Sequence, residues 1–283
     1  MTGFPLRLAR QWIAGETIND GVARAREANS KGFLGLLNLL GEEIKSREEI
    51  KTTLLEYSNL LARIEESRVK SQISVKPTQL GLTLNYDDCL QNYLVITELC
   101  RSHSENWLWV DMENSPYTEK TIELYKYVLS KYPNTGIAIQ AYLRRSETDL
   151  RDLLAAGAKV RLVKGAYNES PEIAFKNKRE VSENYAKLMK MLFEQSEKNL
   201  FAIATHDGRL VEQGKELSKK NNSHFEFEML MGVRDKLKAD LVLQKYQVRE
   251  YIPYGPEWFA YSMRRLREKK SNIFLLARSL FSS

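Results

Sequence analysis

Cysteine, histidine, glycine and proline are all scarce in this chain. Its 283 residues include 2 Cys, 3 His, 14 Gly and 7 Pro. Cys89 and Cys100 have no CxxC motif and no His pair nearby, so we expect two reduced thiols rather than a disulfide framework. So few Cys and His residues predict that no metal site is present. The low glycine and proline content excludes collagen-like and low-complexity chains.

Long apolar runs are also missing. None approaches the roughly 18–20 residues that a membrane-spanning helix needs, and the opening stretch MTGFPLRLARQWIAGE is too polar for a signal peptide. We therefore expect a cytoplasmic protein. The net charge of +6 arises from 43 basic and 37 acidic side chains, which are interleaved along most of the chain. This pattern argues against a nucleic-acid-binding surface.

Short apolar runs alternate eight times with longer amphipathic segments. The expected strands are residues 33–40, 73–80, 107–113, 136–143, 160–167, 201–206, 225–231 and 249–254. Runs this short and apolar are typical of parallel strands buried on both faces. Helix starts are indicated by Ser46 with Glu49, by Ser115 and Ser170 before prolines, and by Asp207.

Eight strand–helix units predict an α/β protein built as a closed parallel (β/α)8 barrel. An open, doubly wound sheet is the rival architecture. No linker rich in Pro, Gly or Ser interrupts the sequence, so we expect a single domain over residues 1–283. Within it, residues 1–31 would form helical decoration, residues 32–270 the barrel and residues 271–283 a C-terminal tail.

Polar side chains gather near the ends of the expected strands. They are Lys76, Asp111, Glu113, Gln140, Tyr142, Arg161, Lys164, Tyr167, Thr205, His206, Glu226, Glu228, Tyr251 and Tyr254. Ion pairing inside the barrel would explain any single charge, whereas the whole cluster favours a site, because parallel barrels carry their chemistry at the C-terminal ends of strands. Its cations suit an anionic or electron-rich ligand. Neither GxGxxG nor GxxxxGK[ST] occurs, so a Rossmann site and a P-loop are unsupported.

Two further features are suited to ligand binding. The small pair Gly165 and Ala166 would let a planar ligand approach the backbone closely. Near the C-terminus, Tyr261, Arg264 and Glu268 share one helix face, with Arg265 beside it. A solvated, salt-bridged helix would show the same charges. The functional interpretation is a two-arginine clamp for a carboxylate, with Glu268 orienting an arginine.

Several segments together resemble the proline dehydrogenase family, FAD-dependent enzymes of proline catabolism. The most specific are RLVKGAY (residues 161–167) and YIPYGPEWFAYSMRRLRE (251–268). Others are NLLGE (38–42), SVKPTQLG (74–81), VDMENS (110–115), IQAYLRR (139–145) and ATHD (204–207). The resemblance covers roughly residues 32–270. It implies a distorted TIM-type barrel whose eighth helix lies over the C-terminal ends of the strands.

The resemblance also implies roles for individual residues. Asp111 and Arg161 match the catalytic positions. The implied substrate-binding residues are Lys76, Arg264 and Arg265 for the carboxylate, with Tyr251, Tyr261, Tyr167 and Leu230 around the ring. The implied FAD-binding residues are Met112, Gln140, Arg161, Val163, Lys164, Gly165, Ala166, Thr205 and His206. Glu228 and Asp207 depart from the family pattern, in which Gln and Asn are frequent at these positions.

The implied reaction is hydride transfer from L-proline to the flavin N5, which yields 1-pyrroline-5-carboxylate, the first step towards glutamate. In such an enzyme the cofactor supplies the chemistry and the protein supplies orientation and electrostatics. The electrons would pass to a quinone, which fits peripheral contact with the inner face of the cell membrane. The stretch RRLREKKSNIFLLARSLF (264–281) is basic and apolar enough for such contact. A helix that closes the barrel could have the same composition.

Two other classes of function remain open from the sequence. A (β/α)8 aldolase or lyase would use Lys164 as a Schiff-base lysine in a dry pocket. A non-enzymatic barrel would act as a membrane-bound scaffold through its C-terminal stretch. The sequence leaves the oligomeric state open.

Overall fold

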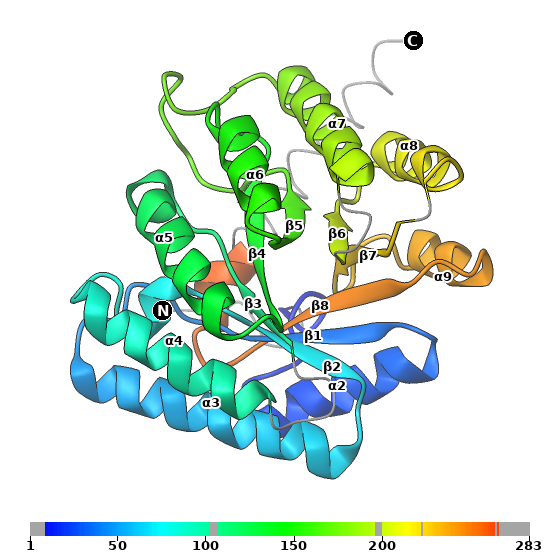
Figure 1. The fold of residues 1–283 in the computed structure, drawn as a ribbon. Coiled ribbons are helices and arrows are strands. Elements are labelled where there is room, and N and C mark those ends of the chain that lie inside the picture. Colours follow the sequence, from blue (N-terminus) through cyan, green and yellow to red (C-terminus); the bar gives the residue numbers. More distant parts are fainter. Residues whose placement is uncertain (1–8, 102–106, 196–199, 222, 264, 266–283) are drawn as a thin grey trace, which may run out of the picture.

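Eight parallel strands close into a barrel in chain order (Figure 1). The computed structural model describes residues 9–101, 107–195, 200–221, 223–263 and 265. The strands are β1 (Leu34–Leu39), β2 (Ser71–Val75), β3 (Leu108–Val110), β4 (Thr135–Gln140), β5 (Lys159–Val163), β6 (Phe201–Ala204), β7 (Phe225–Leu230) and β8 (Val248–Tyr254). Because β1 pairs with β8 along its whole length, the closed (β/α)8 barrel is confirmed and the open sheet is excluded.

Helices connect successive strands and cover the outside of the barrel. They are α2 (Ile18–Ser30), α3 (Arg47–Ser67), α4 (Tyr86–Arg101), α5 (Ser115–Lys131), α6 (Ser146–Ala155), α7 (Lys178–Gln195), α8 (Gly208–Ser218) and α9 (Asp235–Leu243), with a 3₁₀ turn η1 (Pro77–Leu80). The longer helices bury an apolar face, as Leu124, Tyr125 and Val128 of α5 illustrate. None of the helices in the described part of the chain is long and apolar enough to span a bilayer.

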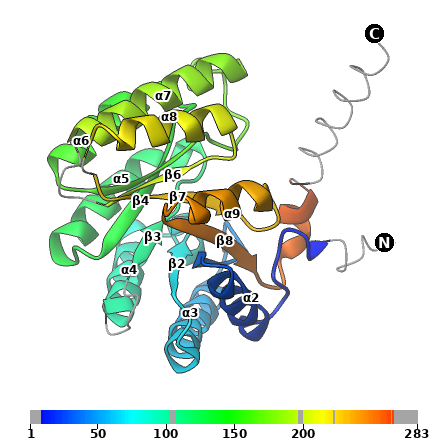
Figure 2. The ribbon, with the colours of Figure 1, turned by 90° about the vertical axis from the view of Figure 1, so that its right-hand side faces the viewer.

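The ring of outer helices is completed by α2, which precedes β1. This helix packs across β1 and β8 and beside α3 (Figure 2). Gly21 allows close contact, since a Cβ there would lie 3.1 Å from Leu37 and 3.2 Å from Tyr254, and Arg24 pairs with the buried Glu250 at 2.5 Å. Thus α2 is an integral part of the barrel rather than decoration.

The segment after β8 lies at the C-terminal end of the barrel. Residues 258–263 are helical, and Tyr261 packs against Leu40, at the end of β1, and against Trp12 and Ile13. In Figure 2 this orange-red segment follows the tip of β8 instead of returning along its outside. The distorted barrel expected from the resemblance is therefore confirmed.

Some local expectations were wrong. The second strand covers Ser71–Val75, not residues 73–80, because the chain turns at Lys76 into the 3₁₀ turn that begins at Pro77. The fifth strand ends at Val163, not at residue 167. Ser170 starts no helix: the chain there forms a turn, an isolated bridge joins Leu143 to Ala174, and α7 begins only at Lys178.

Other start signals are confirmed by their capping contacts. The Ser46 hydroxyl accepts a hydrogen bond from the Glu49 N–H at 3.2 Å, at the start of α3. The Asp207 carboxylate accepts one from the Arg209 N–H at 3.1 Å, at the start of α8.

The barrel interior changes character along its axis. Near the N-terminal ends of the strands, Arg249 and Glu226 form a bidentate ion pair of 2.7 and 3.1 Å, and Arg249 also donates to the Gly35 carbonyl at 2.9 Å. Above this pair, Trp109 and Tyr251 belong to an apolar cluster inside the barrel. Beyond that cluster, at the C-terminal ends of the strands, the interior becomes polar again.

Candidate active site

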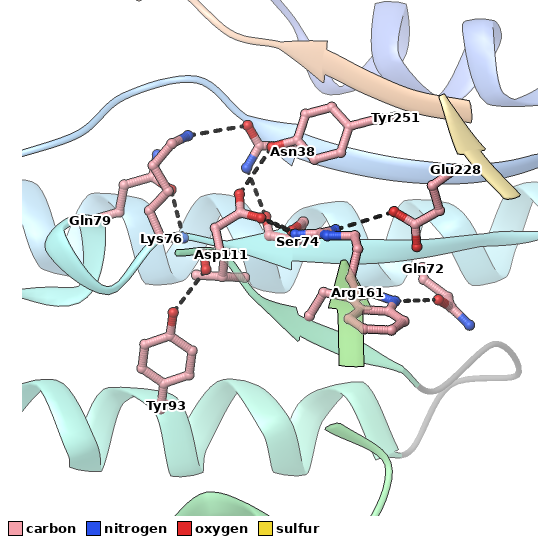
Figure 3. A network of polar contacts seen from close by, with 12 residues as sticks. Asn38, Gln72, Ser74, Lys76, Gln79, Tyr93, Asp111, Arg161, Glu228 and Tyr251 are labelled. Carbon is pink, nitrogen blue, oxygen red and sulfur yellow. Dashed lines mark hydrogen bonds and ion pairs between the residues drawn. The ribbon is translucent and has the colours of Figure 1, made fainter. Parts of the chain in front are cut away.

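A buried carboxylate, Asp111, is the centre of the polar network at the strand ends (Figure 3). It follows β3 directly. One oxygen, Oδ1, accepts hydrogen bonds from the Ser74 hydroxyl at 2.6 Å and from the Arg161 guanidinium. The other, Oδ2, accepts from the Tyr251 hydroxyl at 3.0 Å. Residues from β2, β3, β5 and β8 thus converge on one carboxyl group.

The charge of Asp111 is stabilised by these neighbours. Burial acts to raise its pKa, but the cations Arg161 and Lys76, with the hydrogen bonds from Ser74 and Tyr251, hold that pKa below its ordinary value. Asp111 is therefore ionised near neutral pH, and it can orient the tyrosine ring and the guanidinium but not donate a proton.

Arg161 is 3% exposed and lies between two carboxyl groups. Its Nη2 contacts Asp111 and donates to the Ser74 hydroxyl at 3.2 Å. Its Nη1 lies 3.5 Å from a carboxylate oxygen of Glu228 and makes no hydrogen bond in the described part of the chain. The guanidinium carbon is 5.3 Å from the centre of the Trp109 ring, which supports it by a cation–π contact.

The amide side chains of Gln79 and Asn38 hold Lys76 at the turn after β2. The Gln79 side chain accepts from the Lys76 N–H at 3.5 Å and donates to the Leu39 carbonyl at 2.9 Å. The Lys76 ammonium lies 3.4 Å from the Asn38 side-chain oxygen, and the Asn38 amide donates to the Ser74 carbonyl at 2.9 Å. Lys76 is 9% exposed.

Asn38, Ser74 and Gln79 were missed as site residues by the sequence reasoning. All three are at most 1% exposed, and they hold Asp111 and Lys76 in place. They lie in the segments NLLGE and SVKPTQLG. The available signal was their polarity within otherwise apolar runs, since a buried amide or hydroxyl needs a partner.

The ends of four neighbouring strands form a partly exposed, apolar floor. Side chains alternate between the two faces of a strand, and Arg161, Ala202, Glu228 and Arg249 face the interior. The next inward positions are Val163, Ala204, Leu230 and Tyr251, and all four are only partly buried. These four residues, called the floor below, offer an apolar surface to a planar ligand directly above Arg161.

Polar groups from β4 and β6 lie around the floor. Gln140, the last residue of β4, donates to the Glu113 carbonyl at 2.8 Å. The Thr205 hydroxyl accepts from the Asp207 N–H at 3.2 Å. His206 Nε2 accepts from the Leu230 N–H at 2.9 Å. Burial, and then the positive charge of Arg265, lower the pKa of His206 to about 4, so its neutral ring carries the proton on Nδ1 and can donate from there.

Gly165 has a structural reason of its own to be glycine. Its φ of +109° favours glycine, and a Cβ would lie 2.2 Å from the Tyr142 ring. Packing against Tyr142 thus requires the glycine, and its contact with a ligand stays a prediction. Ala166 is exposed.

Lys164 makes an ion pair at the edge of the site. Its ammonium contacts the Asp207 carboxylate at 2.7 Å and donates to the Ser182 hydroxyl at 3.0 Å, and its side chain is 34% exposed. A Schiff-base lysine needs a free amine in a dry pocket. The Lys164 ammonium is instead engaged by Asp207 and partly exposed, and this geometry argues against the lyase hypothesis.

Other expected site residues are placed less centrally. Tyr167 packs in a small apolar cluster with Tyr142 and Leu143, apart from Asp111. Met112 is buried in the main core of the barrel. Arg264 and Glu268 lie outside the described residues, so their roles stay predictions.

A cavity of about 990 Å³ opens beside the polar network. Lys76 and Tyr261 both line it, together with Leu39 and Leu40. The Arg265 guanidinium lies 5.5 Å from the centre of the Tyr261 ring. Lys76 and Tyr261 thus share this cavity, and Arg265 lies beside Tyr261; their contact with a substrate stays a prediction.

Glu113 is a second buried carboxyl group near the site. The Thr78 N–H donates to it at 2.9 Å and the Thr78 hydroxyl at 2.6 Å. Burial, only partly offset by these bonds, raises the pKa of Glu113 to about 7. The folded protein thus retains a proton that the unfolded chain releases at lower pH.

We expect this proton to make stability depend on pH. Because the folded-state pKa is raised, the favourable contribution of Glu113 is complete below the ordinary pKa and is lost as the pH rises to about 7. Replacing Glu113 with Gln, which can still pair with Thr78, should reduce the fall in unfolding free energy between pH 5 and 8 by about 3 kcal/mol. Urea denaturation at four pH values measures this difference; parallel curves for both proteins would contradict it.

Comparisons with known proteins agree with this geometry. Residues 22–277 match the family described as proline dehydrogenase. The chain is 35% identical to proline dehydrogenase 2 of Bacillus subtilis (strain 168), over 96% of this chain and 93% of the relative. It is 30% identical to a proline dehydrogenase of Deinococcus radiodurans, over 94% and 87% of the two chains.

A solved structure gives the same result for the fold. Proline utilization A from Bdellovibrio bacteriovorus, inactivated by N-propargylglycine, is similar with a TM-score of 0.85 and 25% identity. The match covers 92% of this chain and 32% of that one, so this chain spans about a third of the larger protein. With the family match over most of its length, the chain belongs to the proline dehydrogenase family.

Proposed function

We propose that this protein oxidises L-proline to 1-pyrroline-5-carboxylate with FAD as the hydride acceptor. The observation that carries the proposal is the Asp111–Arg161 pair, buried beneath the floor at the ends of β5 to β8 and beside Lys76. Family membership makes proline the substrate to test first.

The residues on one side of the site suit the substrate. Lys76 would bind the proline carboxylate, together with Arg265 and, outside the described residues, Arg264. Tyr251 would contact the ring, because its hydroxyl is fixed by Asp111 at 3.0 Å. Tyr261, which lines the cavity with Lys76, would close the ring pocket. Several fixed cations around one carboxylate orient the substrate and so lower the entropic part of the barrier.

The residues on the other side fit a flavin. Val163 and Ala204 of the floor offer an apolar surface away from Tyr251, and the Arg161 Nη1 below the floor is buried without a hydrogen bond among the described residues. Gln140, Thr205 and the neutral His206 would add polar contacts around the rim. FAD, when bound, supplies the acceptor for the hydride. Arg161 would favour negative charge above it, and the floor would exclude water from one face of the ring.

We further propose that the electrons pass to a quinone and that the protein works in the cytoplasm, in peripheral contact with the membrane. The support is the basic and apolar composition of residues 264–281. Deleting residues 272–283 should weaken binding to anionic vesicles without changing proline oxidation by a soluble acceptor dye. Unchanged vesicle binding would show that residues 272–283 do not make the membrane contact.

An anaerobic visible spectrum tests the main proposal most directly. The purified protein should show a flavin spectrum that bleaches when L-proline is added. If proline fails to bleach the flavin, the substrate is a molecule other than proline. A colourless protein that FAD cannot reconstitute, and that borohydride inactivates in the presence of a carbonyl substrate, would instead support the Lys164 lyase.

A further inference from the structure

Glu228 is a buried carboxyl group with an incomplete set of partners. It lies on β7, is 3% exposed and faces the barrel interior. Its Oε2 is 3.5 Å from Arg161 Nη1, and its Oε1 makes no hydrogen bond in the part of the chain that the structure describes. An ionised carboxylate in such a place is costly unless several donors surround it.

The charged groups around Glu228 come from several parts of the fold. Arg161 lies on β5, Asp111 directly after β3, Arg249 on β8 and Glu226 on its own strand. The Tyr185 hydroxyl of α7 is within electrostatic range of Glu228, and Tyr251 of β8 lies beside Arg161, with its ring centre 5.7 Å from the guanidinium carbon. Arg249 is engaged bidentately by Glu226, and Arg161 is engaged by Asp111. Each nearby cation therefore already has its own carboxylate.

This arrangement gives Glu228 a different charge state from Asp111. Burial, with the repulsion of Glu226 and Asp111, outweighs the attraction of Arg161 and raises the pKa of Glu228 to about 8. The pKa values of Tyr185 and Tyr251 are raised well above 10, so neither tyrosine ionises in the same range. With Glu228 protonated, the charges of Asp111 and Arg161 cancel; with Glu228 ionised, these three groups carry a net negative charge next to the cations that would bind the carboxylate.

We propose that Glu228 is a positioning residue that acts through Arg161: its protonated form keeps the site positive enough for the substrate carboxylate, and its ionised form weakens binding. The inference rests on the proposed function, because it takes the ligand to be the carboxylate of proline. Binding of this anion is then coupled to the uptake of a proton by Glu228.

A ligand without an amino group tests the proposal. Tetrahydrofuran-2-carboxylate has the ring and carboxylate of proline, lacks its titrating amine and cannot be oxidised in the same way. Calorimetric titration of the FAD-loaded protein should show a Kd that rises roughly fivefold to tenfold between pH 6.5 and 9.5. In the Glu228→Gln variant the Kd should stay within about twofold between pH 8 and 9.5, where Glu113 is already ionised.

Glu113→Gln is the matched control, because Glu113 is the other buried carboxyl group with a raised pKa but contacts Thr78 rather than Arg161. This variant should keep the rise in Kd above pH 8. The same rise in Glu228→Gln as in the unaltered protein would overturn the inference and leave the proposed function standing. No binding of the probe by any of the three proteins, at any pH, would overturn the proposed function and the inference with it.

A second measurement needs no variant. At pH 8.5, titrations of the unaltered protein in two buffers of different ionisation enthalpy should reveal uptake of a substantial fraction of a proton with each bound probe. Binding without proton uptake would overturn the inference even if Glu228→Gln fails to fold.

Discussion

Replacement of Arg161 by methionine should lower kcat/KM for proline by roughly a thousandfold, about 4 kcal/mol. Methionine keeps much of the side-chain volume but leaves Asp111 and Glu228 without the cation between them. Asp111 then loses its strongest partner, and its hold on Tyr251 weakens. Steady-state kinetics with a soluble electron acceptor measure the loss, and flavin content per chain shows whether cofactor binding falls with it.

Arg249→Met is the matched control for this prediction. Arg249 is as deeply buried, but it pairs with Glu226 and donates to the Gly35 carbonyl, whereas Arg161 pairs with Asp111. Both variants should lose stability, since an unpaired buried carboxylate remains in each. Only Arg161→Met should lose most of its activity per folded, flavin-loaded molecule. Equal activity losses in the two variants would mean that Arg161 is needed for the stability of the barrel rather than for the reaction.

Replacement of Lys76 by methionine should raise the KM for proline about a hundredfold, or about 2.7 kcal/mol, with kcat changed only severalfold. The ammonium of Lys76 sits at the cavity that Tyr261 also lines, so its removal takes away a charge that holds the carboxylate. Flavin content should be unchanged, because Lys76 lies across the network from the floor.

Lys45 provides a control for the loss of a positive charge from the cavity lining. It lines the same cavity but is exposed. Lys45→Met should leave the KM within about twofold, since exposed charges are strongly screened. A comparable rise in both variants would mean that either lysine acts only as a distant charge, and that Lys76 does not bind the carboxylate directly.

The sequence predicted the barrel well because its signals are local. Apolar runs of strand length recur eight times, and helix starts such as Ser46 and Asp207 depend on residues three or fewer positions away. The sequence prediction failed where one local pattern is compatible with two different structures. Ser170 before a proline is also a turn sequence, and the turn prevailed where residue 174 bridges to Leu143.

The candidate site was predicted only as a set of residues. Asp111 and Arg161 were both singled out, yet their pairing spans fifty positions and depends on β3 and β5 facing each other across a closed barrel. Nor could a sequence pattern show that Lys164 turns to Asp207 while Lys76 turns inward. These choices are made by tertiary packing, which no spacing rule encodes.

The position of α2 has a consequence for how such an enzyme can diversify. Because α2 covers β1 and β8 from outside, the seam of the barrel is sealed by its buried small and apolar residues, such as Gly21, Val22 and Ala25. The start of the same helix, at Ile18 and Asn19, lines the cavity that Lys76 also lines. Mutations in the middle of α2 would therefore be filtered by folding, whereas mutations in its first turn can alter which molecules the enzyme accepts. Selection for a stable scaffold and selection for new substrates thus act on different turns of one helix.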